Sequence, residues 1–164
     1  MLIITLVLLL LMANGAPLLA GHWLHSRCLY AIQRPIDAGY CCRDGQRLLG
    51  ESKTWQGLLA ALFITTAAAA LLQFPLWAAM LLALLAMIGD LISSFIKRRL
   101  HCRRGLNMPG LDQLPESLLP MLGVSLVLPL SGLQILFPVL LFILIHIVLT
   151  ELLSALRFHP KHCR

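Results

Sequence analysis

The chain has 164 residues, of which 59% are hydrophobic and 12% are charged, and its mean hydropathy is +0.86. This composition excludes an ordinary soluble domain and is typical of a polytopic membrane protein. Because so little polar sequence remains, we expect residues 1–164 to form a single membrane-embedded domain.

The basic residues carry information on topology. The formal net charge is +6, which in a soluble protein would suggest a nucleic-acid partner. Here the thirteen Lys and Arg residues are confined to three segments: five between 27 and 53, five between 97 and 104, and three between 157 and 164. This distribution follows the positive-inside rule, so we expect these segments to be cytoplasmic and expect no nucleic-acid partner. The five cysteines lie in the same segments, so we expect reduced thiols.

Five apolar segments alternate with polar ones. The first, residues 2–20, has no Lys or Arg before it and so lacks the charged start of a signal peptide; we expect an uncleaved helix. The other apolar segments are 57–72, 75–96, 115–130 and 133–153. The loops that we expect to be cytoplasmic are 21–56 and 97–114.

The fourth apolar segment allows two interpretations. Pro115, Pro120 and Pro129 interrupt it, and its clean apolar part is short enough for a re-entrant segment. If the segment crosses the membrane, however, both uncharged turns lie outside and all three basic segments lie inside. That agreement favours an all-α integral membrane protein with about five transmembrane helices, its N-terminus outside and its C-terminus cytoplasmic. We expect it in the cell membrane, with its active site on the cytoplasmic face.

A polar stripe follows the third apolar run. Asp90 comes after the sixteen uncharged residues 74–89, which cover about 24 Å of helix and place the acid near the inner edge of a hydrocarbon core about 30 Å thick. Ser93, Ser94 and Lys97 follow at helical spacing and share its face. An acid at that depth is costly unless it faces a wet cavity, a partner or a metal.

Two polar segments, 34–57 and 89–113, carry the residue types that a metal–polyphosphate site needs. The carboxylates that could bind Mg²⁺ are Asp37, Asp90 and Asp112. The bases that could bind phosphate are Lys53, Lys97, Arg98 and Arg99. Neither a P-loop nor a dinucleotide-binding glycine motif occurs in the sequence, so it predicts neither a P-loop nor a Rossmann site.

Four short motifs stand out in these segments: PIDAG at 35–39, GESKTWQG at 50–57, GDLISSFIKRR at 89–99 and MPGLDQ at 108–113. In the same order they resemble the PIDGG, GDGKTWRG, GD-x-x-x-SF-x-KRR and P-x-x-DQ motifs of the CDP-archaeol synthases, a family similar to the CDP-diacylglycerol synthases. KTW alone would be a weak signal, but agreement in two separated segments is a strong one.

The resemblance implies a cytidylyltransferase that joins a membrane lipid phosphate to CTP, giving a CDP-lipid and pyrophosphate in phospholipid biosynthesis. It also implies that Asp90 and Asp112 bind Mg²⁺ and that these two acids and Lys97 are catalytic. The CTP- and phosphate-binding residues that it implies are Asp37, Lys53, Thr54, Trp55, Ser93, Ser94, Arg98, Arg99 and Gln113. The attacking phosphate monoester is largely a dianion at neutral pH, so no strong general base is needed.

The sequence departs from the family pattern at three positions. Ala38 replaces a glycine, Glu51 an aspartate and Gln56 an arginine. These changes suggest a divergent branch. They leave open whether the acceptor lipid carries isoprenoid ether chains, as archaetidic acid does, or acyl chains, as phosphatidate does, and the motifs do not bear on oligomeric state.

Several features have two interpretations. Trp55 either stacks on cytosine or anchors the chain at the membrane interface, and Ser93 and Ser94 either bind phosphate or pack against neighbouring helices. His146, midway along the last apolar segment, either relays protons or contacts substrate, or it is a neutral imidazole bonded to a neighbouring helix, which we favour. For the whole protein, the alternative is a non-enzymatic small transporter or lipid-binding subunit. The DG-x-x-AR signature of CDP-alcohol phosphotransferases, which consume CDP-lipids, is absent.

Overall fold

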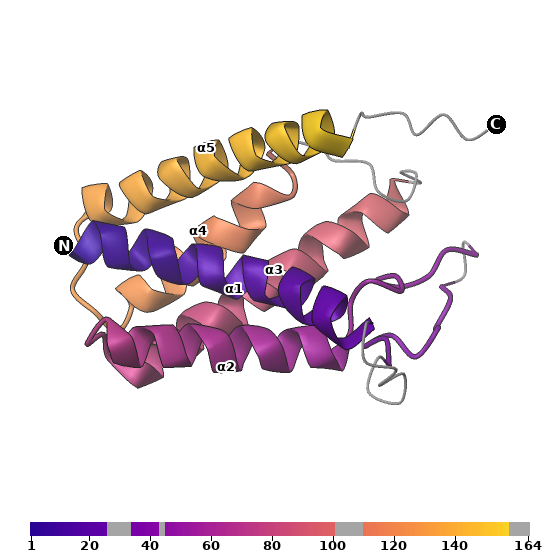
Figure 1. Ribbon diagram of the computed structural model, residues 1–164, viewed down its shortest axis with the longest axis horizontal. Coiled ribbons are helices and arrows are strands. Elements are labelled where there is room, and N and C mark those ends of the chain that lie inside the picture. Colours follow the sequence, from indigo (N-terminus) through magenta and orange to yellow (C-terminus); the bar gives the residue numbers. More distant parts are fainter. Residues whose placement is uncertain (26–33, 43–44, 101–109, 158–164) are drawn as a thin grey trace.

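The computed structural model describes residues 1–25, 34–42, 45–100 and 110–157 (Figure 1). These residues form five α-helices: α1 (Leu2–His25), α2 (Trp55–Leu71), α3 (Leu76–Arg99), α4 (Gln113–Ser125) and α5 (Gly132–Arg157). Within the described ranges, β structure is limited to two isolated bridges in the first polar loop, which pair Pro35 with Thr54 and Cys41 with Arg47. The predicted all-α architecture is confirmed for these residues.

Each predicted apolar segment corresponds to one helix, with shifted bounds. α1 continues past residue 20 to His25, and α5 continues past residue 153 to Arg157. In the part of the chain that the structure describes, α1, α3 and α5 are long and apolar enough to cross a membrane, and α2 is a shorter apolar helix of 17 residues.

The fourth segment differs most from its predicted bounds of 115–130. α4 has only 13 residues, about 20 Å of helix, whereas a hydrocarbon core is about 30 Å thick. It contains Pro120 and ends at Ser125, and Pro129 in the following turn restricts Leu128 to a non-helical conformation. The chain then continues to α5, which starts at the end of the bundle opposite to the end of α3 (Figure 1).

α3 packs against α1, α2 and α4, while α5 packs against α1 and α4. The central face of α3 is built from small residues: Ala78, Ala79, Ala83 and Ala86 are fully buried. Small side chains let helix backbones approach closely, which is how helices pack where lipid removes the hydrophobic drive for association. Around the outside, large apolar side chains such as Phe63 (77% exposed) and Leu133 (73% exposed) face away from the core, as expected for a surface in contact with lipid.

The two ends of the bundle differ in character. The N-terminus, the α2–α3 turn and the start of α5 lie together at one end (Figure 1). The polar loop 34–54 and the ends of α3 and α5 lie at the other. All described basic residues therefore gather at one end, where the candidate site residues also lie.

Candidate active site

The first polar loop folds around the carboxylate of Asp37. The side chain is fully buried and accepts three hydrogen bonds, at 3.0–3.2 Å, from the backbone N–H groups of Gly39, Leu49 and Gly50. Arg47 Nη2 lies 3.3 Å from the same carboxylate. Burial by itself would raise the pKa of Asp37, but these N–H donors and Arg47 hold the pKa below its ordinary value. Asp37 thus organises the loop, and its implied role in substrate binding stays a prediction.

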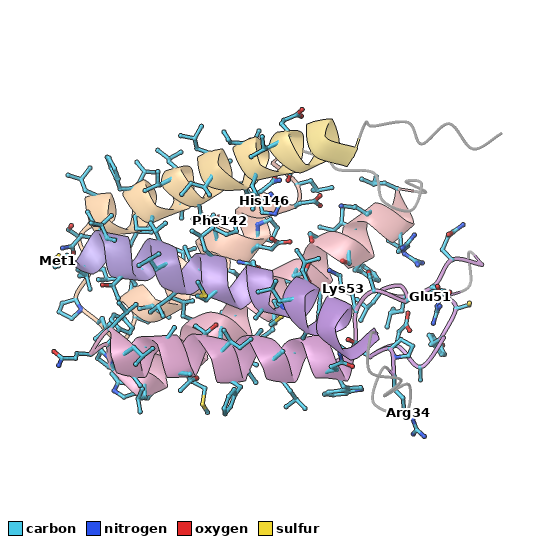
Figure 2. The ribbon with its side chains drawn as sticks, in the orientation of Figure 1. Met1, Arg34, Glu51, Lys53, Phe142 and His146 are labelled. Atoms are coloured by element: carbon cyan, nitrogen blue, oxygen red, sulfur yellow. The ribbon has the colours of Figure 1, made fainter. Side chains whose placement is uncertain are left out.

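The end of this loop reaches α3 through Lys53 (Figure 2). The ammonium Nζ of Lys53 lies 2.6 Å from each carboxylate oxygen of Asp90, and each side chain is 21% exposed. Two local contacts position the lysine: Ile36 N–H donates to its carbonyl at 2.8 Å, and Thr54 caps α2 by accepting the Gly57 N–H at 3.2 Å. An acid and a base from two different motifs, 37 residues apart, therefore meet directly.

A second ion pair joins α3 to the start of α4. Lys97 Nζ lies 2.6 Å from Asp112 Oδ2, with the two side chains 23% and 13% exposed. Lys97 is two helical turns beyond Asp90 on α3, and Asp112 directly precedes α4. The three residues predicted to be catalytic thus lie on one side of α3, where α4 begins.

A third acid, Glu116, was not among the predicted site residues. It is 8% exposed and lies close enough to Asp90, Lys53 and Asp112 to interact with them electrostatically. The spacing of four residues between Asp112 and Glu116, at the start of an apolar helix, was the available signal, since it puts both acids on one helical face. We call these five residues the carboxylate–lysine cluster: Lys53, Asp90, Lys97, Asp112 and Glu116.

The cluster depends on the close crossing of α3 and α4 at Gly89. A Cβ atom built on Gly89 would overlap the carbonyl of Pro115 and lie 2.9 Å from the backbone nitrogen of Glu116. Only glycine permits this approach. The backbone of Glu116 therefore lies directly against the residue that precedes Asp90, which explains why the two carboxyl groups meet.

The sequence model of the CarS-like family, described as CDP-archaeol synthase, matches residues 2–78 and 66–159. The chain belongs to this family. The CDP-archaeol synthase of Thermococcus onnurineus is 42% identical over 113 residues, which cover 62% of this chain and 61% of the relative. That of Aeropyrum pernix is 41% identical over 132 residues, covering 76% and 69%. The chain spans about three fifths of the length of the Thermococcus relatives.

A solved structure shares this fold. It is described as that of an intramembrane enzyme for archaeal membrane lipids biosynthesis, and it matches with a TM-score of 0.74 and 35% sequence identity. The match covers 90% of this chain and 92% of the other. The similarity to this intramembrane enzyme therefore extends to the arrangement of the helices.

Two departures from the CDP-archaeol synthase pattern, Ala38 and Glu51, lie in the first polar loop, and the third, Gln56, lies on α2. Ala38, where the family motif has glycine, has φ +46°, a left-handed conformation that costs a residue with a side chain about 1–2 kcal/mol. Glu51 keeps a carboxylate 2.7 Å from Arg47 Nη1. Gln56 is 7% exposed and donates to the Ala20 carbonyl at 3.4 Å, which joins α2 to α1.

The two arginines after Lys97 contact the loop backbone. Arg98 Nε donates to the Leu49 carbonyl at 3.4 Å, and Arg99 Nη2 donates to the Arg47 carbonyl at 3.0 Å. Gly50, with φ +115°, lets Arg98 lie against the loop, since an added Cβ would be 2.8 Å from its guanidinium. The KRR end of α3 therefore docks the loop over the site, and the implied phosphate binding by Arg98 and Arg99 stays a prediction.

Three other implied substrate-binding residues lie outside the cluster. Trp55 begins α2, is 53% exposed and lines an open pocket of about 490 Å³. The rest of that lining comes from the loop: Arg34, Pro35, Ile36, Ala38, Gly39 and Arg47. Ser93 is 2% exposed and donates to the Asp90 carbonyl at 3.0 Å, while Ser94 is half-buried. Both interpretations of Trp55 and of the serines remain predictions.

Gln113 lies against α5. It is 4% exposed, and its amide Nε2 is 3.2 Å from Nδ1 of His146. The interpretation of His146 as an imidazole bonded to a neighbouring helix is therefore confirmed in its geometry. α5 reaches the candidate site through this contact.

The donor chemistry of the cluster fits the Mg²⁺ that the family resemblance implies. Among the described residues, no group of three or more His, Cys, Asp or Glu side chains is close enough to form a complete protein cage for a metal. Mg²⁺ is commonly held by one or two carboxylates, with phosphate and water as the other ligands, so Asp90 and Asp112 are a suitable set. Both acids are paired with lysines at 2.6 Å, so a cation bound there would compete with these lysines for the carboxylates.

Proposed function

We propose that this chain is a Mg²⁺-dependent CTP:lipid-phosphate cytidylyltransferase that produces a CDP-activated lipid and pyrophosphate. The observation that carries the proposal is the contact of Lys53 with Asp90 at 2.6 Å, which joins the GESKTWQG and GDLISSFIKRR motifs in one partly buried site. Membership of the CDP-archaeol synthase family supports the same reaction.

The reaction exchanges one phosphorus–oxygen bond for another. An oxygen of the lipid phosphate attacks the α-phosphorus of CTP, the bond to the bridging oxygen of the β-phosphate breaks, and pyrophosphate leaves. The attacking dianion is already deprotonated, so no side chain has to remove a proton. The site must instead neutralise and align two anions. A metal bound by carboxylates, together with lysines, would do both.

Lys53 and Lys97 are suited to exchange a carboxylate partner for a phosphate partner. Bound Mg²⁺ would neutralise charge on the phosphates, with Asp90 and Asp112 as its proposed ligands. Lys53 and Lys97, which neutralise these acids in the structure, would then bind phosphate oxygens of the two substrates. Each ammonium keeps an anionic partner throughout, so the exchange leaves no buried charge unpaired.

The position of the cluster suits an acceptor that remains in the bilayer. Asp90 lies nine residues, about 14 Å of helix, before the end of α3. A lipid phosphate at headgroup height can approach from the side of the bundle, and CTP can approach from the polar end where loop 34–54 lies. We propose that this end faces the cytoplasm and that all five helices span or enter the membrane with the N-terminus outside.

Reporter fusions test this topology. Fusions at Gln73 and Ser131 are expected to report an outside location, and fusions at Arg104 and Arg164 an inside location, because the basic segments favour the cytoplasm. A cytoplasmic Ser131 would contradict the proposed crossing by the fourth segment.

The activity is tested with purified protein, labelled CTP, Mg²⁺ and a panel of lipid phosphates. We expect label to enter a lipid product and unlabelled pyrophosphate to form in equal amount when CTP carries the label on its α-phosphate. Comparing isoprenoid ether acceptors with acyl acceptors identifies the acceptor class. Binding of lipid phosphate without incorporation of label from CTP would instead support the lipid-binding subunit.

A further inference from the structure

A chain of hydrogen bonds connects α5 to the turn that carries Asp112. The backbone N–H of Gly110 donates to Oε1 of Gln113 at 2.7 Å, and Nε2 of Gln113 lies 3.2 Å from Nδ1 of His146. Gly110 has φ +90°, and Leu114 N–H donates to its carbonyl at 3.0 Å. The Gln113 side chain therefore closes a tight turn that contains Asp112.

These contacts determine the direction of each hydrogen bond. Because the Gly110 N–H needs an acceptor, the carbonyl oxygen of the Gln113 amide faces Gly110 and its NH₂ group faces His146. An NH₂ group can only donate, so Nδ1 of His146 is the acceptor and the ring carries its proton on Nε2. His146 thus accepts from the amide orientation of Gln113 that the Gly110 turn requires.

The residues packed around these hydrogen bonds hold them in place. Ser117 is fully buried and donates to the Gln113 carbonyl at 2.7 Å, and Gln113 itself is 4% exposed. The Phe142 ring lies 5.8 Å from the His146 ring, and both side chains point from α5 into the bundle (Figure 2). Because the Gln113 amide is buried, water cannot replace a hydrogen bond that it loses, so losing one costs free energy.

We propose that His146 is a positioning residue for the reaction: through Gln113 it holds the Gly110–Gln113 turn so that Asp112 meets Lys97 and the other members of the carboxylate–lysine cluster. This inference rests on the proposed function only in its effect on turnover. Its structural content, the order of the 110–113 turn, stands independently.

Two substitutions at His146 separate the effect of the Nδ1 acceptor from the effect of the aromatic ring. His146→Phe keeps an aromatic ring but removes Nδ1, while His146→Asn loses the ring but keeps an acceptor oxygen at a similar distance from the backbone. Thr150→Val on the same helix is the matched control, since it removes only a hydrogen bond to the His146 carbonyl (2.8 Å). Amide hydrogen exchange of the 110–113 turn is measured by mass spectrometry, and CDP-lipid formation is measured on the same samples.

We expect His146→Phe to increase exchange in the turn several-fold and to lower kcat by up to about ten-fold, as the loss of one buried hydrogen bond allows, with KM for CTP nearly unchanged. His146→Asn and Thr150→Val are expected to stay within about two-fold of the unmodified protein in both measurements. Wild-type exchange in His146→Phe, or equal impairment of His146→Phe and His146→Asn, would overturn the proposal.

The two readouts also separate this proposal from the proposed function. If the unmodified protein forms no CDP-lipid, the proposed function fails, but the exchange comparison still decides the role of His146. If His146→Phe does not fold, His146→Leu replaces it, and a fully protected turn in that variant would overturn the proposal in the same way.

Discussion

Asp90→Asn is expected to abolish CDP-lipid formation while the protein stays folded. Asparagine has nearly the same shape as aspartate but lacks the negative charge that a divalent cation requires. It also leaves Lys53, 2.6 Å from both carboxylate oxygens, without its charged partner, so one positive charge in the site is no longer balanced. We expect turnover to fall by at least about a thousand-fold, comparable with the loss of a major electrostatic contributor in other enzymes.

Controls for this prediction use the same chemical change elsewhere. Glu151→Gln, on the exposed part of α5, also converts a carboxylate to an amide and is expected to keep wild-type turnover. Lys97→Ala is a separate test of the site: we expect it to weaken CTP binding by a few kcal/mol at most, the range of one charged hydrogen bond. Size-exclusion profiles verify folding. Turnover of Asp90→Asn at the wild-type rate would refute the metal assignment.

Gly89→Ala is expected to lower both stability and turnover, although alanine is normally the better helix residue. The added Cβ would overlap the Pro115 carbonyl where α3 and α4 cross. The two helices must then separate, at a cost of about 1–3 kcal/mol for an overpacked core. Since Asp90 and Glu116 flank this crossing, separation also moves the carboxyl groups apart, so turnover is expected to fall more than stability alone would explain.

Gly15→Ala in α1 is the matched control, because an added Cβ there meets nothing within 4 Å. Relief of the glycine penalty should stabilise this variant by up to about 1 kcal/mol. Thermal unfolding in detergent and CDP-lipid formation are measured for both variants. Equal stability changes in Gly89→Ala and Gly15→Ala would show that the crossing is looser than described.

Much of this protein was determined by features that can be read along the chain. The five helices follow from apolar runs interrupted by prolines and polar loops, because helix formation in lipid depends on the local sequence. The gathering of the described basic residues at one end follows from the same pattern. Lys53, Asp90, Lys97 and Asp112 could be proposed from their motifs, and the structure places all four in one cluster.

Only the tertiary structure decided which groups meet. The pairing of Lys53 with Asp90 and of Lys97 with Asp112 depends on where the loop docks and where α4 starts, which no local periodicity specifies. Glu116 enters the cluster because a glycine on a different helix lets two backbones touch. The same reason applies to His146, whose partner Gln113 lies 33 residues away: a contact between helices depends on their crossing points, and those are set by packing over the whole bundle.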